Sequence, residues 1–191
     1  MRPLEWVTQA LLLNSYYILN IKAYRILRTH SEQVANKAIL IGQRLNQQNH
    51  TDSIDIDFIA EAALLHDIGI FAVHAPGLGC FGQQPYLRHG LIGAQLLDAE
   101  GMPRHARVCE RHIGVGLTSK EIATQKLPLP QRDYLPLTIE EQIITYADLF
   151  FSKNPNKLTQ EKSSTKVRQT VTYYGEEKGL IFDQWHTQFG Q

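Results

Sequence analysis

The chain has 191 residues, of which 43% are hydrophobic, and this length and apolar content suit one domain with a sizeable core. Its 19 basic and 19 acidic side chains cancel, so whole-chain charge gives no reason to expect a nucleic-acid backbone or an anionic membrane as partner. We therefore expect neither a polymeric nucleic acid nor a membrane as partner, and any phosphate binding should be local.

The N-terminal stretch Leu4–Ile26 is apolar, but polar residues interrupt it. Its longest uninterrupted apolar run, Ala10–Leu13, is far shorter than the roughly 18–20 residues that cross a bilayer. The stretch also lacks the small-residue cleavage site of a signal peptide. Cys80 and Cys109 have no metal-like spacing and are expected to be reduced thiols. The sequence thus predicts a cytoplasmic protein.

Apolar residues recur at helical spacing along most of the chain, and no segment shows sustained strand-like alternation. This pattern predicts an all-α fold. After an N-terminal helix, the segment Ser31–Leu45 is expected to form a helix with His30 at its start. Thr29 or Ser31 is the expected cap of that helix.

The next helix is expected to begin near residues 55–57 and to carry the adjacent pair His66 and Asp67 at its end, before Gly69. The segment 71–86 is rich in glycine and proline and predicts an irregular loop over the site. Its glycines match the dinucleotide pattern G-x-G-x-x-G, but no strand–helix alternation surrounds them. We therefore interpret them as loop residues that allow close folding over a substrate.

Two helices are expected in the middle of the chain, each carrying one histidine. The helix 88–100 has His89 in its first turn, and the helix that begins near residue 103 reaches His112 and stops at Gly114 or Gly116. Gly101 ends the first of these helices, and the proline at position 103 suits the first turn of the second. A short polar helix and a proline-punctuated connection are expected in residues 118–136.

The last third of the chain is also expected to be helical. Thr138 and Glu141 predict a capping box before a helix with a buried face around Asp148. Residues 159–190 predict two further helices. Their expected aromatic anchors are Tyr173, Tyr174, Phe182, Trp185 and Phe189.

Six ionisable residues stand beside apolar helical faces in five separate segments. A buried ionised carboxylate costs several kcal/mol unless a cation compensates it. Taken alone, each residue could be a hydrogen-bonded core histidine or a capping aspartate, but the repetition favours one shared centre. Imidazole and carboxylate together are the ligands of catalytic transition metals. The six residues are His30, His66, Asp67, His89, His112 and Asp148.

These residues carry a resemblance to a known family. The chain resembles the HD-domain superfamily of metal-dependent phosphohydrolases, and His66-Asp67-Ile68-Gly69 matches its HDIG signature motif. Within that superfamily it is similar to an uncharacterised prokaryotic group. The resemblance covers roughly residues 24–153. The similar segments are 28–35, 62–69, 88–90, 110–116 and 140–153.

The resemblance implies a single HD-type helical bundle over residues 1–191, with core motifs in 24–153 and C-terminal helices in 159–190. It also implies a first metal ion and, as in the binuclear subset of the family, a second one. The implied ligands of the first ion are His30, His66, Asp67 and Asp148. The additional ligands of the second ion are His89 and His112, with Asp67 as the catalytic bridging residue.

Mixed imidazole and carboxylate ligands favour iron, manganese, zinc, cobalt or nickel over a magnesium-only site. Two such ions would lower the pKa of a bridging water and orient it toward phosphorus. The implied activity is hydrolysis of a small phosphoester or nucleotide. Lys153, Arg88 and Arg111 are the expected phosphate contacts, with a solvated surface charge as the alternative for each. No general acid is identifiable in the sequence.

Two alternatives remain at this point. Some proteins similar in fold use the same ligand pattern in di-iron oxygenases, and others keep the fold as non-catalytic ligand-binding domains. The sequence leaves open the substrate and whether the chain forms a homo-oligomer. His74, in the irregular loop, could touch a substrate, whereas His50, His105 and His186 are interpreted as surface residues.

Overall fold

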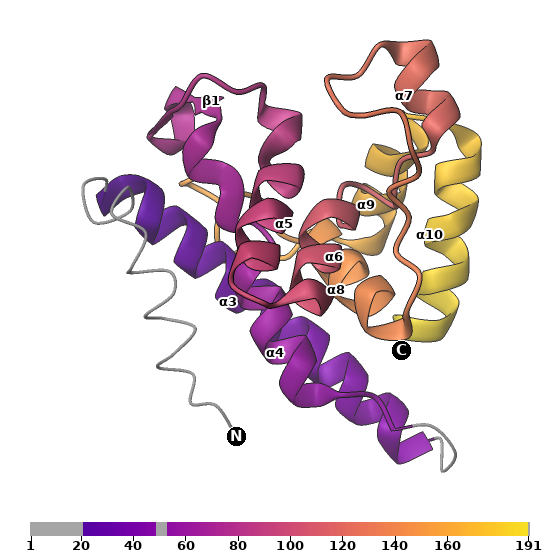
Figure 1. The fold of residues 1–191 in the computed structure, drawn as a ribbon. Coiled ribbons are helices and arrows are strands. Elements are labelled where there is room, and N and C mark those ends of the chain that lie inside the picture. The colour runs from indigo at the N-terminus through magenta and orange to yellow at the C-terminus, as the bar shows by residue number, and fades with distance from the viewer. Residues whose placement is uncertain (1–20, 49–52, 191) are drawn as a thin grey trace.

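The computed structural model describes residues 21–48 and 53–190, and within them the chain forms eight α-helices and one small β-hairpin (Figure 1). This confirms the predicted all-α class. Among the residues that the structure describes, no helix combines the length and the apolar character that crossing a membrane requires. The helices are α3 (Ile21–Gln48), α4 (Ile56–Leu65), α5 (His89–Ala99), α6 (Pro103–Arg111), α7 (Ser119–Gln125), α8 (Ile139–Leu149), α9 (Ser164–Thr172) and α10 (Glu176–Phe189).

Helix α3 is longer than the sequence pattern predicted. It runs unbroken through Thr29, His30 and Ser31, so the expected cap at Thr29 or Ser31 is wrong. The apolar residues before and after His30 lie on one buried stripe, and the helix therefore needs no break there. His30 belongs to that stripe and is fully buried. The expected helix before residue 21 lies outside the described residues. The stripe comprises Ala23, Leu27, Val34, Ala38, Ile41 and Leu45.

Helix α4 ends at the His66–Asp67 pair, as the sequence predicted. Asp55 caps its N-terminus, because the Asp55 side chain accepts a hydrogen bond of 3.0 Å from the backbone N–H of Phe58. After Asp67 the chain continues as a 3-10 helix, Ile68–Ala72. Both members of the pair are fully buried at this change of helix type.

Gly69 lies where this 3-10 helix packs against α5. A Cβ atom at Gly69 would lie 2.2 Å from the carbonyl oxygen of His89 and 2.4 Å from the backbone nitrogen of Gly93. Both neighbours are backbone atoms, so neither can yield unless α5 shifts. The glycine of the HDIG sequence thus sets the position of the helix that carries His89.

Gly69→Ala is expected to lower the free energy of unfolding by about 2–3 kcal/mol, because the added methyl group forces α5 away from the 3-10 helix. Gly77→Ala is the matched control, since a Cβ atom at Gly77 would meet nothing within 4 Å. We expect the control to change stability by less than about 0.5 kcal/mol. Urea unfolding measures both values, and equal values for the two variants would contradict the close approach at Gly69.

The segment 71–86 is more regular than the irregular loop that its glycines and prolines predicted. It contains an antiparallel pair of short strands, β1 (His74–Ala75) and β2 (Cys80–Phe81), in which His74 pairs with Phe81. Gly79 has a φ of 83°, a left-handed conformation that suits glycine and lets the chain reverse. A 3-10 turn over Tyr86–Arg88 then leads into α5. His74 is exposed on this hairpin.

The helices that carry the six ionisable residues pack on one another. Helix α3 packs against α4 and α8, α5 packs against α6, and α6 also contacts α4 and α8. Helices α9 and α10 pack together, and α10 covers α8. In Figure 1 the helices α5, α6 and α8 lie between the α3–α4 pair and the group of α7, α9 and α10. The ligand-bearing segments therefore meet in the interior.

Two expectations about the last third of the chain need correction. Thr138 caps α8, but the Glu141 carboxylate accepts from the backbone N–H of Leu137 at 2.8 Å, so the capping box is only half formed. Tyr173 and Tyr174 are 86% and 66% exposed, because they follow the end of α9, and they are not core anchors. The other three predicted anchors are buried, namely Phe182, Trp185 and Phe189.

Candidate metal centre

The six ionisable residues of the predicted series come together in the interior of the protein. They come from α3, the end of α4, the start of α5, the end of α6 and the last turn of α8. The five residues other than Asp148 are at most 3% exposed, and the Asp148 side chain is 15% exposed. Residues separated by as many as 118 positions thus share one buried site.

The carboxylate of Asp67 lies at the middle of this site. Its Oδ2 atom is 3.4 Å from Nε2 of His30 and 3.2 Å from Nε2 of His66. Its Oδ1 atom is 3.2 Å from Nε2 of His89 and 3.4 Å from Nε2 of His112. The two oxygens of one carboxylate therefore face two different pairs of imidazoles.

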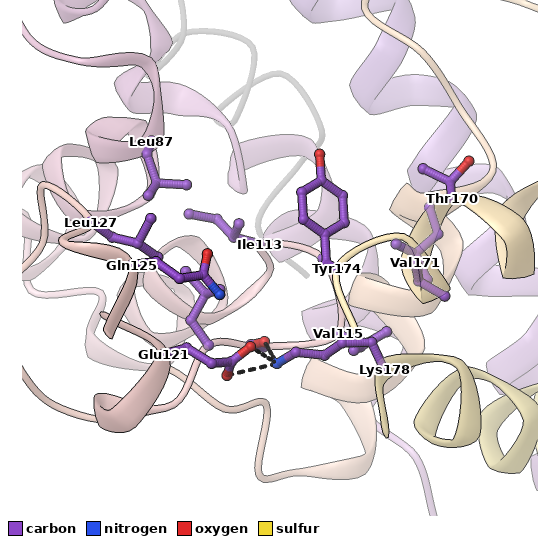
Figure 2. A pocket seen from close by; sticks show the side chains of 14 residues that line it. Leu87, Ile113, Val115, Glu121, Gln125, Leu127, Thr170, Val171, Tyr174 and Lys178 are labelled. Atoms are coloured by element: carbon purple, nitrogen blue, oxygen red, sulfur yellow. Dashed lines mark hydrogen bonds and ion pairs between the residues drawn. The ribbon is translucent and has the colours of Figure 1, made fainter. Parts of the chain in front are cut away.

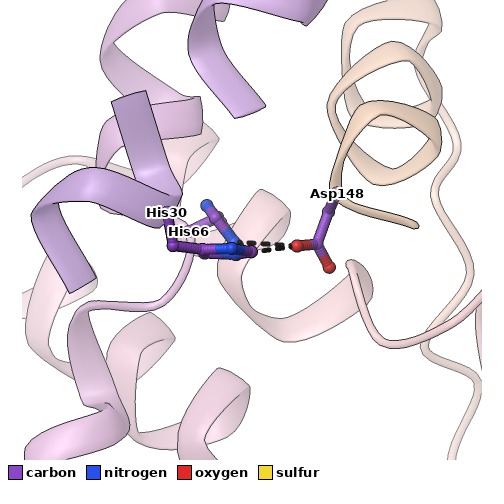
Figure 3. A group of neighbouring side chains, drawn as sticks. All are labelled: His30, His66 and Asp148. Carbon is purple, nitrogen blue, oxygen red and sulfur yellow. Dashed lines mark ion pairs between the residues drawn. The ribbon is translucent and has the colours of Figure 1, made fainter. Parts of the chain in front are cut away.

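Asp148 approaches the first of these pairs from α8. Its Oδ1 atom is 2.9 Å from Nε2 of His30 and 3.5 Å from Nε2 of His66. Figure 3 shows both imidazoles directed toward the same carboxylate. His30, His66 and Asp148 thus form one compact group of donors, and Oδ2 of Asp67 borders it.

Backbone carbonyl groups orient three of the imidazoles. The Nδ1 atoms of His66, His89 and His112 lie 2.7, 2.6 and 2.7 Å from carbonyl oxygens three residues earlier in the chain. A proton on Nδ1 is donated to each carbonyl, and in a neutral imidazole this leaves the lone pair of Nε2 directed into the site. In this tautomer the Nε2 atoms of His89 and His112 face each other as acceptors at 3.1 Å. A cation is the group that satisfies two such acceptors.

The charges in the site favour bound cations. Burial disfavours the charged form of His66, but the carboxylates of Asp67 and Asp148 outweigh it and raise the pKa of His66 to about 10. Burial alone would raise the pKa of Asp67, yet Lys153 and His66 hold it well below its usual range. The pKa of His30 is lowered to about 4 by burial and by Lys153. Burial alone would raise the pKa of Asp148 too, yet Lys153 and His30 hold it well below its usual range, so both carboxylates are ionised and attract cations.

The donor atoms fit one or two metal ions. Nε2 of His66 and Oδ1 of Asp67 are buried without a hydrogen-bond partner among the described residues. Such atoms are costly unless another group satisfies them, and nitrogen and oxygen donors of this kind suit transition metals. Two groups of side chains have donor atoms within 4.8 Å of one another: His30, His66 and Asp148, and His66, Asp67 and His112.

Comparison with known proteins places this arrangement in a family. Residues 27–151, which include all six predicted ligands, match the HD domain family model. The chain belongs to the HD-domain family. The match ends before Lys153 and before α9 and α10, so the C-terminal helices of this HD domain lie outside the matched region.

Three relatives give the HD domain further context. This chain is 34% identical over 134 residues to an uncharacterised protein of Methanocaldococcus jannaschii, and the match covers 66% of this chain and 72% of that protein. It is 33% identical over 152 residues to a tRNA (cytidine(56)-2'-O)-methyltransferase of Thermoplasma volcanium, covering 79% of this chain and 36% of that protein. A Picrophilus torridus protein with the same methyltransferase name is 40% identical over 95 residues, which cover 49% of this chain and 24% of that protein. The chain thus matches about a third and a quarter of the length of these two methyltransferases.

One solved structure shares the fold. The HD domain of the L. monocytogenes phosphodiesterase PgpH matches with a TM-score of 0.53 at 18% sequence identity. The match covers 88% of this chain and 84% of the PgpH chain. It supports the HD-type helical arrangement that the sequence predicted.

The sequence predicted three cationic residues as phosphate contacts. In the structure these three residues have different surroundings. Nζ of Lys153 is 2.7 Å from Oδ2 of Asp67, inside the centre. The Arg111 guanidinium instead donates to both carboxylate oxygens of the buried Glu141, at 3.2 and 3.1 Å. Neighbouring positions of a helix diverge by about 100°, so Arg111 points away although it precedes a ligand. Arg88 donates to the side chain of Gln84 at 3.1 Å.

Some residues near the HD centre were not identified from the sequence. The Tyr86 carbonyl orients His89, and the Tyr86 ring packs on that imidazole with 4.9 Å between ring centroids. Its position three residues before His89 in the chain is the only local signal for this role.

His105 and His186 were predicted as surface residues, but both are half-buried. His105 contacts the carboxylate of Glu61 at 3.2 Å, and His186 contacts the hydroxyl of Tyr146 at 2.7 Å. His50 lies outside the described residues.

Proposed function

We propose that this HD domain is a metal-dependent phosphohydrolase that cleaves a small phosphoester or nucleotide through a metal-activated water. Membership of the HD-domain family supports a metal-dependent hydrolase. The observation that carries the proposal is the placement of Asp67, whose two carboxylate oxygens face separate pairs of imidazoles. This arrangement supports a carboxylate that bridges two ions. The proposal treats residues 1–191 as one domain.

The donor groups divide naturally between two divalent transition metal ions. His30, His66 and Asp148 would hold the first ion together with Oδ2 of Asp67. His89 and His112 would hold the second with Oδ1 of the same carboxylate. Bound ions of this kind polarise phosphoryl oxygens and lower the pKa of a bound water. The donor set favours iron, manganese, zinc, cobalt or nickel.

The protein's own groups would orient the substrate. The carbonyl oxygens that hold His66, His89 and His112 fix three donors before any substrate arrives, which avoids reorganisation during the reaction. A cation bound at Oδ2 of Asp67 would compete with the ammonium group of Lys153 for that oxygen. The ammonium group would then bind a phosphoryl oxygen and stabilise the negative charge that develops on it.

Metal content and hydrolysis test the proposal together. We expect about two ions per chain in metal-loaded protein and about one in His89→Ala, because that variant removes a donor of the second ion only. His105→Ala is the matched control, since His105 is a half-buried histidine paired with Glu61 outside the centre. The control should keep both ions. Elemental analysis measures the ions, and a panel of phosphomonoesters, cyclic nucleotides and dinucleoside polyphosphates measures hydrolysis.

Three outcomes would contradict the proposal. The first is metal-loaded protein that hydrolyses no member of the panel. The second is iron content accompanied by substrate-dependent oxygen uptake, which would favour a di-iron oxygenase on the same donors. The third is protein that is isolated without metal and keeps its stability after His66→Ala, which would favour a non-catalytic ligand-binding domain.

A further inference from the structure

A mostly apolar pocket of about 290 Å³ lies between the middle of the chain and its C-terminal helices (Figure 2). Leu87, Ile113 and Leu127 line one side of it, and Val171 lies across from them. The ring of Tyr174 stands between the two sides in Figure 2. The volume is close to the lower end of the range for small-molecule sites, which are usually apolar with a few polar groups.

The pocket borders three of the segments that carry the proposed ligands. Ile113 and Leu149 line the pocket, and each directly follows a proposed ligand, His112 and Asp148 respectively. Leu87, two residues before the ligand of α5, also lines it. Consecutive Cα atoms are only 3.8 Å apart, so the backbone that carries these three ligands also runs along the pocket. A phosphoester whose phosphate lies at the metal centre would place its remaining part in this pocket.

The charged residues of the pocket are already paired with each other. Lys178 is 4% exposed, and its Nζ atom donates to the Gly116 carbonyl at 2.8 Å and lies 2.7 Å from Oε1 of Glu121. Glu121 also accepts from the backbone N–H of Thr118 at 2.8 Å, which completes the capping box of α7. The pair therefore fastens α10 to α7 and offers no unbalanced charge. An uncharged group suits such a pocket better than an anion or a cation.

The remaining features favour a flat ring with polar edges. The ring of Tyr174 meets the ring of Tyr173 in a T-shaped contact, with 5.4 Å between ring centroids, and Tyr174 is still 66% exposed, which leaves ring surface for stacking. Gln125 and Thr170 also line the pocket and supply an amide and a hydroxyl group, which can hydrogen-bond to ring heteroatoms. A nucleobase is uncharged near neutral pH and combines a planar ring with such an edge.

We propose that this pocket binds the base of a nucleotide, with the base stacked on Tyr174, while the phosphate lies at the metal centre. The placement of the phosphate rests on the proposed function, but the binding of the base requires no hydrolysis. Tyr174, Val171 and Lys178 lie outside the residues 27–151 that match the family model. The C-terminal helices of this chain would thus determine its preference for nucleotides.

Nucleoside binding tests the inference without hydrolysis. Saturation-transfer NMR with adenosine, guanosine, cytidine and uridine, none of which carries a phosphate, measures binding to the metal-loaded full chain. We expect at least one of them to bind, Tyr174→Ala to weaken that binding about tenfold, and Tyr174→Phe to preserve it. Leu180→Ala is the control, because Leu180 is 55% exposed on α10 and does not line the pocket. It should bind nucleosides and hydrolyse phosphoesters as the unaltered protein does.

A second variant fills the pocket from the opposite side. Leu127→Trp is expected to abolish nucleoside binding while metal content and circular dichroism stay unchanged, since Leu127 is half-buried on the wall facing α9. The inference is overturned if none of the four nucleosides binds at millimolar concentration, or if binding survives both Tyr174→Ala and Leu127→Trp. Nucleoside binding by a protein that hydrolyses no phosphoester would support this inference and refute the proposed function.

Discussion

Asp67→Asn is expected to slow phosphoester hydrolysis by the metal-loaded protein roughly a thousandfold, equivalent to a barrier about 4 kcal/mol higher. The carboxylate supplies an oxygen to each of two imidazole pairs, and an amide can supply only one oxygen. The amide NH2 group would direct its hydrogens toward the other pair and exclude an ion there. Steady-state kcat/KM and elemental analysis on the same samples measure the two effects.

Asp55→Asn is the matched control for this substitution. Asp55 caps the same helix at its other end, eleven residues before His66, and pairs with Arg104 at 2.9 Å. Asparagine is also a good N-cap, so the control should keep both metal content and activity. Asp67→Asn protein that keeps two ions and more than about a tenth of the unaltered rate would contradict a bridging role.

The sequence predicted most helices because their signals are local. Gly101 and Pro103 mark the boundary between α5 and α6, and both helices begin and end close to the expected residues. The error at α3 has the same origin, since Thr29 and Ser31 have the composition of a cap. What decides against a cap is the apolar stripe that continues through His30 and packs on α4 and α8. That packing is a tertiary effect which a local pattern does not contain.

The predicted ligands met in one place because each of them interrupts an otherwise apolar helical face, and such a residue must find a partner in the core. The cationic residues carry no comparable signal. Lys153 reaches Asp67 whereas Arg111 pairs with Glu141, and that choice depends on the directions of α6 and α8. The pocket beside the centre depends on a contact between residues 62 positions apart, Lys178 and Gly116. Sequence spacing alone predicts neither arrangement.

Lys153→Met is expected to change metal binding and hydrolysis in opposite directions. Nζ of Lys153 lies 2.7 Å from Oδ2 of Asp67, so its positive charge opposes a divalent ion at the same oxygen. Removing the charge should tighten metal binding at least about tenfold, or ~1.4 kcal/mol. The same change should slow hydrolysis about a hundredfold, because the phosphoryl oxygens lose a fixed positive donor.

Tighter metal binding together with slower hydrolysis distinguishes a substrate contact of Lys153 from a purely structural role. If Lys153 only neutralised Asp67 to stabilise the fold, Lys153→Met would loosen the centre and weaken metal binding together with activity.

Lys153→Arg keeps the charge and should keep metal affinity near that of the unaltered protein. Lys157→Met, an exposed lysine of the same segment, is the control for loss of a charge and should change neither quantity. Competition with a chelating dye measures metal affinity, and kcat/KM at saturating metal measures hydrolysis. A parallel loss of both would refute the role of Lys153 at the phosphate.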